Sequence, residues 1–500
     1  ATTISQYSIQ TDMKKYLLSL TILLIAVYPM WAQTNKSRAQ ERYEEFQRKT
    51  RQRYESFMKD VNDRYAAMME RVWERYYASR PEERPVFDEP PTPVVDNNPE
   101  QPVVPRPVPI KDVVDEPQPS PVQPQPLEPL PTKPQPAEHP IISFDYFGTL
   151  QAVYKPKMPV LSSLRERDVA QAWKQIGNSE ENVGMLSDML ELRKKLSLCD
   201  WAYMQLIDKA LEATNASKDS RTLMHAWLLA SSGYSMRLGN DSRNLVMLYG
   251  TDYVIYERSY FSLGRYKFYP YKNESANMAI FEQEFPGEKM LSLAVPTLPV
   301  LGTEEVCSSD RVSTVYPDLK LHGCVNKGHI AFFESYPASH YGDNFMTRWA
   351  NIARTPFSQA MHSSLIKDIR AKLEGKNERD GIAMILNWLQ TGFTYKVDND
   401  VWGHDRAFFA EETIYYPYND CEDRAILFSK IVREIYGHDV ALVYYPGHLA
   451  AAVHFSNGPY GDYIEVAGTQ YTICDPTYIN APIGRTMPGM DNSSATLIII

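Results

Sequence analysis

The stretch Asn419-Asp420-Cys421-Glu422-Asp423-Arg424-Ala425 places one cysteine where a helix is expected to begin. Apolar residues follow it at helical spacing, namely Leu427, Phe428, Ile431, Val432 and Ile435. Cys421 therefore falls in or just before the first turn of that helix. The N–H groups and the dipole of a first turn stabilise a thiolate and lower the pKa of the thiol. The sequence thus predicts a nucleophilic sulfur at Cys421.

A catalytic cysteine also needs a base and a group that orients the base. Downstream of Cys421 the chain offers His448, after Pro446-Gly447, and Asp475, before Pro476. His454 is a rival base on the same strand, but six strand residues span about 20 Å, so only one histidine can reach the sulfur. We choose His448, because it lies at the mouth of a strand, whereas His454 precedes a turn. Asp475 is then the orienting carboxylate.

Three carboxylates flank the cysteine: Asp420, Glu422 and Asp423. If unpaired, they would raise the pKa of the thiol by repulsion. Two roles stay open for them: capping of the helix, which we favour, or a Ca²⁺ site built from their oxygens. The alternative for Cys421 is an inert buried thiol, and its charged neighbours speak against burial among apolar side chains.

These motifs resemble the transglutaminase-like cysteine-protease superfamily, and within it the exported bacterial members. The resemblance rests on Asp420–Ala425, Pro446-Gly447-His448 and Asp475-Pro476-Thr477, and covers roughly residues 378–482. It implies an α+β fold with a papain-like core, in which the cysteine helix packs on an antiparallel sheet. It also implies acyl chemistry on amides through a thioester.

The same resemblance raises two further expectations. The family needs a residue that stabilises the oxyanion, and Gln390 and Trp402 are our candidates. The acidic run also resembles that of calcium-dependent periplasmic proteases of the superfamily, which supports Ca²⁺ at Asp420, Glu422 and Asp423.

The N-terminus carries features of an export signal. Met13-Lys14-Lys15 precedes the apolar run Tyr16–Val27, and cleavage after Ala32 would define a signal peptide over 13–32. An uncleaved membrane anchor is the alternative, although the run is shorter than the roughly 18–20 residues of a spanning helix. We expect a bacterial periplasmic or cell-surface protein.

Composition narrows the function further. The net charge of −10 argues against a nucleic-acid binder, whose surface is basic. Five cysteines leave at least one unpaired in an exported protein. Cys307 and Cys324 could close a hairpin-like loop, and Cys421 is the thiol that we leave free.

Two segments precede the globular regions. Residues 36–80 repeat Arg-Tyr every 11 residues, which predicts a straight or slightly right-handed helix. A self-associating coiled coil is favoured over an interfacial helix that touches the cell envelope. Residues 81–140 hold 20 of the 36 prolines and predict a disordered spacer.

Two globular regions follow: 141–365, helical and then β-rich, and 366–500, the catalytic region. His225 lies on an apolar helical face in the first region and is predicted to be a core histidine. Arg221–Gly239 mimics Arg424–Val443, with Lys218 at the place of the cysteine. A degenerate copy and a chance similarity both explain this echo.

The sequence therefore predicts an exported cysteine hydrolase or acyltransferase with Cys421 as nucleophile, His448 as base and Asp475 as orienter. Its substrate would be a protein or peptide, and hydrolysis of a peptide or isopeptide bond is favoured over transfer to an amine. No cofactor is required, apart from the Ca²⁺ suggested above. The alternative is a non-catalytic binding or scaffold module at the cell envelope.

Overall fold

The computed structural model describes residues 41–85, 92–115, 139–272 and 274–500, apart from positions 44, 47, 51, 54, 55 and 58. The chain forms two compact units, one of residues 1–61 with 128–137 and one of residues 62–127 with 138–500. The predicted signal peptide lies outside the described residues. In the first unit, the described residues from 41 onward are helical. All elements named below belong to the second unit.

The predicted helix over 36–80 is shorter than expected. The helix ends at Met69, and the last Arg-Tyr pair of the repeat lies on strand β1 (Glu74–Tyr77). Tyr65 and Met69 are buried, and Tyr65 packs against Trp173 and Phe281. The end of the repeat is therefore part of a globular core and is not available for self-association.

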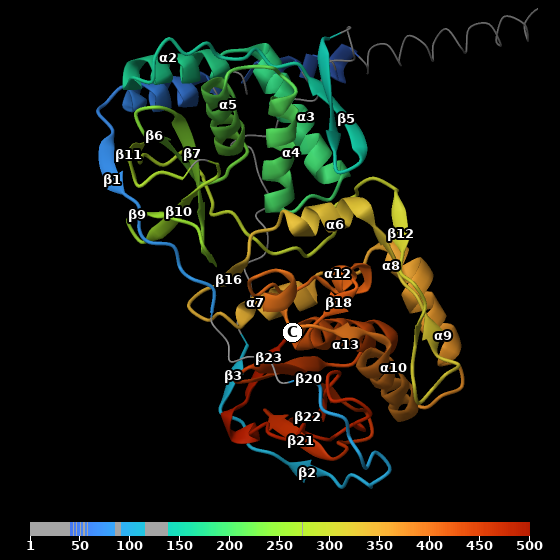
Figure 1. Ribbon diagram of the computed structural model, residues 1–500. Helices are drawn as coiled ribbons and strands as arrows, with labels where there is room; N and C mark the ends of the chain where they lie inside the picture. Colours follow the sequence, from blue (N-terminus) through green and yellow to red (C-terminus); the bar gives the residue numbers. More distant parts are fainter. Residues whose placement is uncertain are drawn as a thin grey trace, which may run out of the picture. The chain divides into compact units, whose positions relative to one another are not determined.

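The amino-terminal half of the second unit combines four helices with a six-stranded sheet (Figure 1). Its helices are α2 (Glu166–Gly177), α3 (Glu180–Lys195), α4 (Asp200–Glu212) and α5 (Lys218–Ser231). The sheet has the order β1-β11-β6-β7-β10-β9 and contains β6 (Met236–Asn240), β7 (Leu245–Thr251), β9 (Phe261–Leu263), β10 (Tyr266–Pro270) and β11 (Asn277–Phe281). A separate hairpin joins β4 (Ile141–Tyr146) and β5 (Thr149–Tyr154).

Short elements connect the two halves. The paired strands are β8 (Tyr253–Ile255) with β16 (Ser339–Tyr341), β12 (Glu305–Cys307) with β15 (Cys324–Asn326), and β13 (Arg311–Val312) with β14 (Lys320–Leu321). The helices are α6 (Lys327–Glu334), α7 (Thr347–Arg354), α8 (Gln359–Met361), the π-helix His362–Ile366 and α9 (Lys367–Lys372). Cys307 and Cys324 form the expected disulfide. The predicted boundary at 365/366 is wrong, because it falls inside this helical run, and 138–500 is one compact unit.

The carboxy-terminal half packs helices on a seven-stranded sheet of the order β2-β21-β22-β20-β19-β23-β3. Its helices are α10 (Glu378–Gly392), α11 (Asp398–Val401), α12 (Ala410–Tyr415) and α13 (Cys421–Tyr436). Its strands are β19 (Val440–Tyr445), β20 (His448–His454), β21 (Asp462–Val466), β22 (Thr469–Cys474) and β23 (Thr496–Ile499), and β17 (Thr394–Tyr395) pairs with β18 (Tyr418–Asn419) outside it. A short 3₁₀ turn, Asn492–Ser494, precedes β23. The molecule is thus a mixed α+β protein.

Part of the predicted linker is ordered. Residues 92–115 supply both edge strands of the seven-stranded sheet, β2 (Arg106–Pro107) on β21 and β3 (Asp112–Val114) on β23. Between these strands, Val108 and Ile110 pack against the cluster that contains Ala450 and Ile473. The prediction of a disordered spacer is therefore wrong for this segment, because its Val and Ile residues cover a sheet. Residues 116–138 lie outside the described part.

Candidate active site

Cys421 is the first residue of helix α13, as the sequence predicts. The Asp420 side chain caps the helix and accepts a hydrogen bond from the Glu422 N–H (3.2 Å), and Asp423 accepts one from the Asp420 N–H (3.2 Å). This reciprocal arrangement is a capping box. At the other end Gly437 has a φ of +69°, the left-handed conformation that ends many helices.

His448 and Asp475 form a buried pair. His448 is the first residue of β20, and Asp475 directly follows β22. His448 Nε2 lies 2.8 Å from Asp475 Oδ2, and both side chains are almost fully buried. Asp475 is held in place because its Oδ1 accepts hydrogen bonds from the N–H groups of Thr477 (2.8 Å) and Tyr478 (3.3 Å). An ionised carboxylate only accepts hydrogen bonds, so Nε2 is the donor.

The other ring nitrogen of His448 is left for a reacting group. Nδ1 is buried and has no hydrogen-bond partner in the described part of the chain. With Nε2 protonated, Nδ1 carries a lone pair and can accept a proton. The rival His454 lies at the far end of β20, where its Nδ1 is 3.1 Å from the Gln470 carbonyl oxygen. The structure thus pairs Asp475 with the histidine that the sequence favours.

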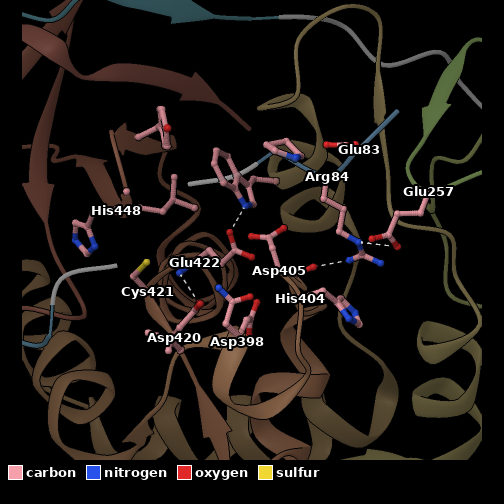
Figure 2. A pocket seen from close by; sticks show the side chains of 17 residues that line it. Glu83, Arg84, Glu257, Asp398, His404, Asp405, Asp420, Cys421, Glu422 and His448 are labelled. Carbon is pink, nitrogen blue, oxygen red and sulfur yellow. Dashed lines mark hydrogen bonds and ion pairs between the residues drawn. The ribbon is translucent and has the colours of Figure 1, made fainter. Parts of the chain in front are cut away.

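Cys421 and His448 line the same cavity, of about 380 Å³. Figure 2 shows them at one end, with Arg84 and Glu257 at the other. The backbone N–H of Leu449, the residue after His448, interacts with the Cys421 thiol and favours its ionised form. The start of α13 and the start of β20 therefore meet at the sulfur.

The pKa of the Cys421 thiol differs from the expectation. Burial raises the pKa of Cys421 well above its usual value, and the charges of Asp420 and Glu422 raise it further. The prediction that the helix N-terminus lowers this pKa is therefore wrong in direction. Cys421 is only 5% exposed, so loss of solvation outweighs the helix dipole. Burial and the neighbouring acids therefore favour the neutral thiol over the thiolate.

Tyr395 on β17 is a site residue without an assigned role in the sequence prediction. Its hydroxyl interacts with the Cys421 sulfur and has no geometrically good hydrogen-bond partner in the described structure. Burial and the neighbouring Cys421 and Asp420 raise the pKa of this phenol, so it stays protonated and can donate. The only signal in the sequence is the stretch Phe393-Thr394-Tyr395. The pairing of β17 with β18 brings Tyr395 to the cysteine, and no local sequence pattern predicts that pairing.

Carboxylates gather beside the cysteine from three separate segments. The oxygens of Asp398, Asp405 and Glu422 lie within 4.8 Å of one another, and so do those of Asp398, Asp420 and Asp423. Figure 2 shows Asp398 and Asp405 between Cys421 and Arg84. Burial, then repulsion by Asp423 and Glu422, raises the pKa of Asp398 to about 9. Five carboxylates this close together repel one another, so the cluster favours a bound proton or cation over five free negative charges.

Glu422 is partly neutralised. Its Oε2 accepts hydrogen bonds from Trp349 Nε1 (2.6 Å) and Arg348 Nη2 (3.1 Å), and Arg348 also pairs with Asp405. Burial raises the pKa of Glu422 to about 7, against the opposing effect of Arg348. Its second oxygen, Oε1, is buried without a hydrogen-bond partner in the described residues. Oxygen donors of this kind suit a hard cation such as Ca²⁺.

The expected capping role is present for two of the three flanking acids. Asp420 and Asp423 satisfy the backbone at the start of α13, and Asp423 Oδ1 also accepts a hydrogen bond from the Phe408 N–H (2.9 Å). Glu422 instead points to Arg348 and Trp349. The predicted trio therefore does not form one ligand set, because each group that could hold an ion also needs Asp398.

Gln390 and Trp402 do not reach the cysteine. The Gln390 amide on α10 donates to the carbonyl oxygens of Asp475 and Ala481 (both 3.1 Å), so it positions the Asp475 loop. The Trp402 ring packs against Phe408 and Tyr416. Neither residue lines the cavity of Cys421. The prediction of an oxyanion role for both is wrong.

The far end of the cavity is built by the amino-terminal half. Glu83 and Arg84, from the segment after β1, and Glu257 line it together with His404. Arg84 Nε lies 3.1 Å from Glu257, and an Arg84 Nη donates to the Asp405 carbonyl. No sequence pattern near Cys421 predicts the contributions of Glu83 and Arg84, because these two residues lie more than 300 positions away in the chain.

Comparison with protein-family models finds no family that matches, and comparison with curated proteins finds no match either. Within the described residues, no helix is both long and apolar enough to cross a membrane.

Proposed function

We propose that this protein is a cysteine-dependent amide hydrolase of the transglutaminase-like kind. The observation that carries the proposal is the buried His448–Asp475 pair: His448 lines the same cavity as Cys421, and its Nδ1 has no hydrogen-bond partner among the described residues. A carboxylate that fixes one imidazole nitrogen prepares the other as a base. A papain-like core is supported by the packing of α13, which begins with the cysteine, on the antiparallel strands β19 and β20.

The first step is attack on the substrate amide. His448 Nδ1 takes the thiol proton, and the Cys421 sulfur forms a bond to the carbonyl carbon. The negative charge moves to the carbonyl oxygen. The Tyr395 hydroxyl and the backbone N–H groups of the first turn of α13 are the donors beside the sulfur that would stabilise it. Asp475 stabilises the imidazolium that results.

The second step releases the amine and then the acid. His448 returns the proton to the leaving nitrogen, the C–N bond breaks, and a thioester stays on Cys421. A water molecule, deprotonated by His448, attacks the thioester, and the carboxylic acid leaves as the thiol is restored. Water is the preferred acceptor. A peptide or isopeptide bond is the substrate that we propose, in a cavity with room for several side chains.

The carboxylates beside Cys421 form the proposed cation site. Asp398, Asp405 and Glu422 would hold Ca²⁺, and the orphaned Glu422 Oε1 is a free ligand atom for it. A bound cation would offset the negative charges that raise the pKa of the thiol. Because protons compete for the same oxygens, Ca²⁺ should raise the melting temperature more at pH 8 than at pH 5. Equal shifts at both pH values, or no shift, would contradict this site.

Export is proposed from the N-terminal signal and from the Cys307–Cys324 disulfide, a bond that persists mainly outside the reducing cytosol. The periplasm or cell surface of a bacterium is the proposed location. Self-association or envelope contact through the helix before residue 62 stays a proposal for that unit alone. Nucleic acid is not a proposed partner, given the net charge of −10.

Incubation with a mixed peptide library, followed by mass spectrometry of the products, tests the proposed function. Wild-type protein with added Ca²⁺ should produce cleavage products that Cys421→Ala and His448→Ala do not. His454→Gln is the matched control on the same strand and should cleave like wild type. Absence of cleavage, together with a Cys421 that no electrophile labels, would favour the non-catalytic scaffold instead.

A further inference from the structure

The two halves of the second unit share one topology. In the carboxy-terminal half, α13 packs on β19 and β20, and the strands run in the order β21-β22-β20-β19-β23. In the amino-terminal half, α5 packs on β6 and β7, and the order is β9-β10-β7-β6-β11. Every pairing among these strands is antiparallel in both halves. Figure 1 shows α5 beside β6 and β7, and α13 beside β20. The echo in the sequence thus marks a second copy of the same unit.

The strand registers align the two copies residue by residue. Tyr445 pairs with His448 across the turn Pro446-Gly447, and the Asp241 N–H donates to the Asn244 carbonyl across Ser242-Arg243. Each hairpin thus has a two-residue turn, with a positive φ at its second residue in one copy (Gly447, +80°) and at its first in the other (Ser242, +77°). His448 therefore corresponds to Asn244.

The same alignment locates the other two members of the site. Ala451 pairs with Cys474 in one copy, and the equivalent Met247 accepts a hydrogen bond from the Tyr271 N–H in the other. Asp475, which follows Cys474, thus corresponds to Lys272. Cys421 follows the capping residue of α13, as Lys218 follows the capping residue of α5. Lys218, Asn244 and Lys272 therefore stand at the positions of Cys421, His448 and Asp475, and none of them can take over the role of its counterpart.

A small cavity of about 60 Å³ lies beside Lys218 and Lys272, the residues at the positions of Cys421 and Asp475. Lys218, Arg221 and His225 of α5 line it, together with Lys272 and the acids Asp208 and Glu212 of α4. Lys272 Nζ binds both acids, at 2.6 Å from Asp208 and 3.3 Å from Glu212. In the other copy, the residue at the same position, Asp475, is instead bonded through its backbone carbonyl oxygen to Gln390 of α10.

Two cations in this cavity are left without a carboxylate. Lys218 Nζ touches only the Asn244 amide oxygen, at 3.5 Å, and Arg221 has no ion pair within the described chain. His225 is 4% exposed, lines the cavity, and its Nε2 lacks a hydrogen-bond partner in the described structure. Burial lowers the pKa of His225 to about 4, so the ring is neutral at pH 7. The prediction that His225 is a satisfied core histidine is therefore wrong in part.

We propose that the amino-terminal half is a non-catalytic copy of the catalytic half and that its cavity binds a compact oxyanion, such as a carboxylate. Lys218 and Arg221 would supply the positive charge, at the N-terminal end of a 14-residue helix whose dipole has the same sign. This proposal stands on the geometry of the first copy and does not depend on the proposed catalysis.

Ligand-observed NMR of the full-length protein tests this site, with acetate as the probe and acetamide as its neutral isostere. Acetate should bind saturably and acetamide should not. The double variant Lys218→Met/Arg221→Met should weaken acetate binding at least tenfold. The matched control, Lys194→Met/Lys195→Met, removes two exposed cations from α3 outside the cavity and should bind acetate within twofold of wild type.

Each outcome decides the proposal. Inorganic phosphate that displaces acetate from wild type would extend the ligand to other oxyanions, and a lack of displacement would restrict it to carboxylates; both support the site. Cys421→Ala should leave acetate binding unchanged. Equal binding of acetamide, absence of saturable acetate binding, or a Lys218→Met/Arg221→Met variant that matches its control would overturn the proposal.

Discussion

The Asp475→Asn variant should switch off the base without breaking the fold. Asp475 Oδ1 accepts two backbone N–H groups, from Thr477 and Tyr478. The amide oxygen of an asparagine must occupy that position, because an NH₂ group there would face two donors. The NH₂ group then faces His448 Nε2 and turns it into an acceptor. The ring proton moves to Nδ1, where it blocks transfer from the Cys421 thiol.

The size of the effect follows from the bond that is lost. A hydrogen bond to an ionised partner contributes roughly 1.5–3 kcal/mol, which corresponds to about 10- to 150-fold in rate. We therefore expect Cys421 in Asp475→Asn to react with iodoacetamide about 10- to 150-fold more slowly at pH 7.5. The free energy of unfolding should fall by only about 1 kcal/mol, because both hydrogen bonds to Oδ1 persist.

Peptide mapping after timed alkylation measures the rate at Cys421 alone. The other free thiols, Cys199 and Cys474, are buried and should stay unlabelled in folded protein. His454→Gln is the control, since it alters the histidine at the other end of β20. A rate in Asp475→Asn within twofold of wild type would refute the argument that Asp475 sets the tautomer of His448.

Three predictions concern stability. Gln390→Ala should lower the free energy of unfolding by about 2–4 kcal/mol in urea, because two buried carbonyl oxygens lose their donor; a loss under 1 kcal/mol would contradict this. Burial lowers the pKa of Lys430 from 10.5 to about 7. Between these values the unfolded chain binds more protons than the folded one, so the free energy of unfolding rises with pH by up to ~5 kcal/mol. Lys430→Met should abolish that rise in thermal melts, whereas the exposed Lys367→Met keeps it. Replacing both disulfide cysteines, 17 positions apart, by serine should cost about 3 kcal/mol, and an unchanged melting temperature would count against a structural role.

The sequence predicts those site residues whose positions follow from local patterns of helix and strand. A capped amphipathic stretch places Cys421 on α13, and alternating strands place His448 and Asp475 at strand ends. Strand length shows that only one of His448 and His454 can reach the sulfur, and the place of His448 at the mouth of the strand decides between them. The echo around Lys218 coincides with the same order of helix and hairpin in both halves, because helices and hairpins have local sequence patterns.

The rest depends on contacts between distant segments. Asp398, Asp405 and Arg348 reach Glu422 only through the packing of three loops and helices, so the acidic cluster is larger than the run around Cys421 suggests. The pKa of the Cys421 thiol is raised, whereas the sequence predicts that it is lowered. The reason is that segments distant in the sequence bury this side chain. Residues 92–115 look like a spacer by composition, yet two short strands pair with the sheet.

The central claim is that Cys421, activated by His448, forms a thioester with a substrate acyl group. Reaction of the protein with an activated acyl ester, followed by intact-mass and peptide mass spectrometry, tests it directly. We predict an acyl group on Cys421 that hydroxylamine removes, formed by wild type, absent from Cys421→Ala and strongly reduced in His448→Ala. An adduct on a different residue, or one that forms equally fast without the His448 imidazole, would contradict the account.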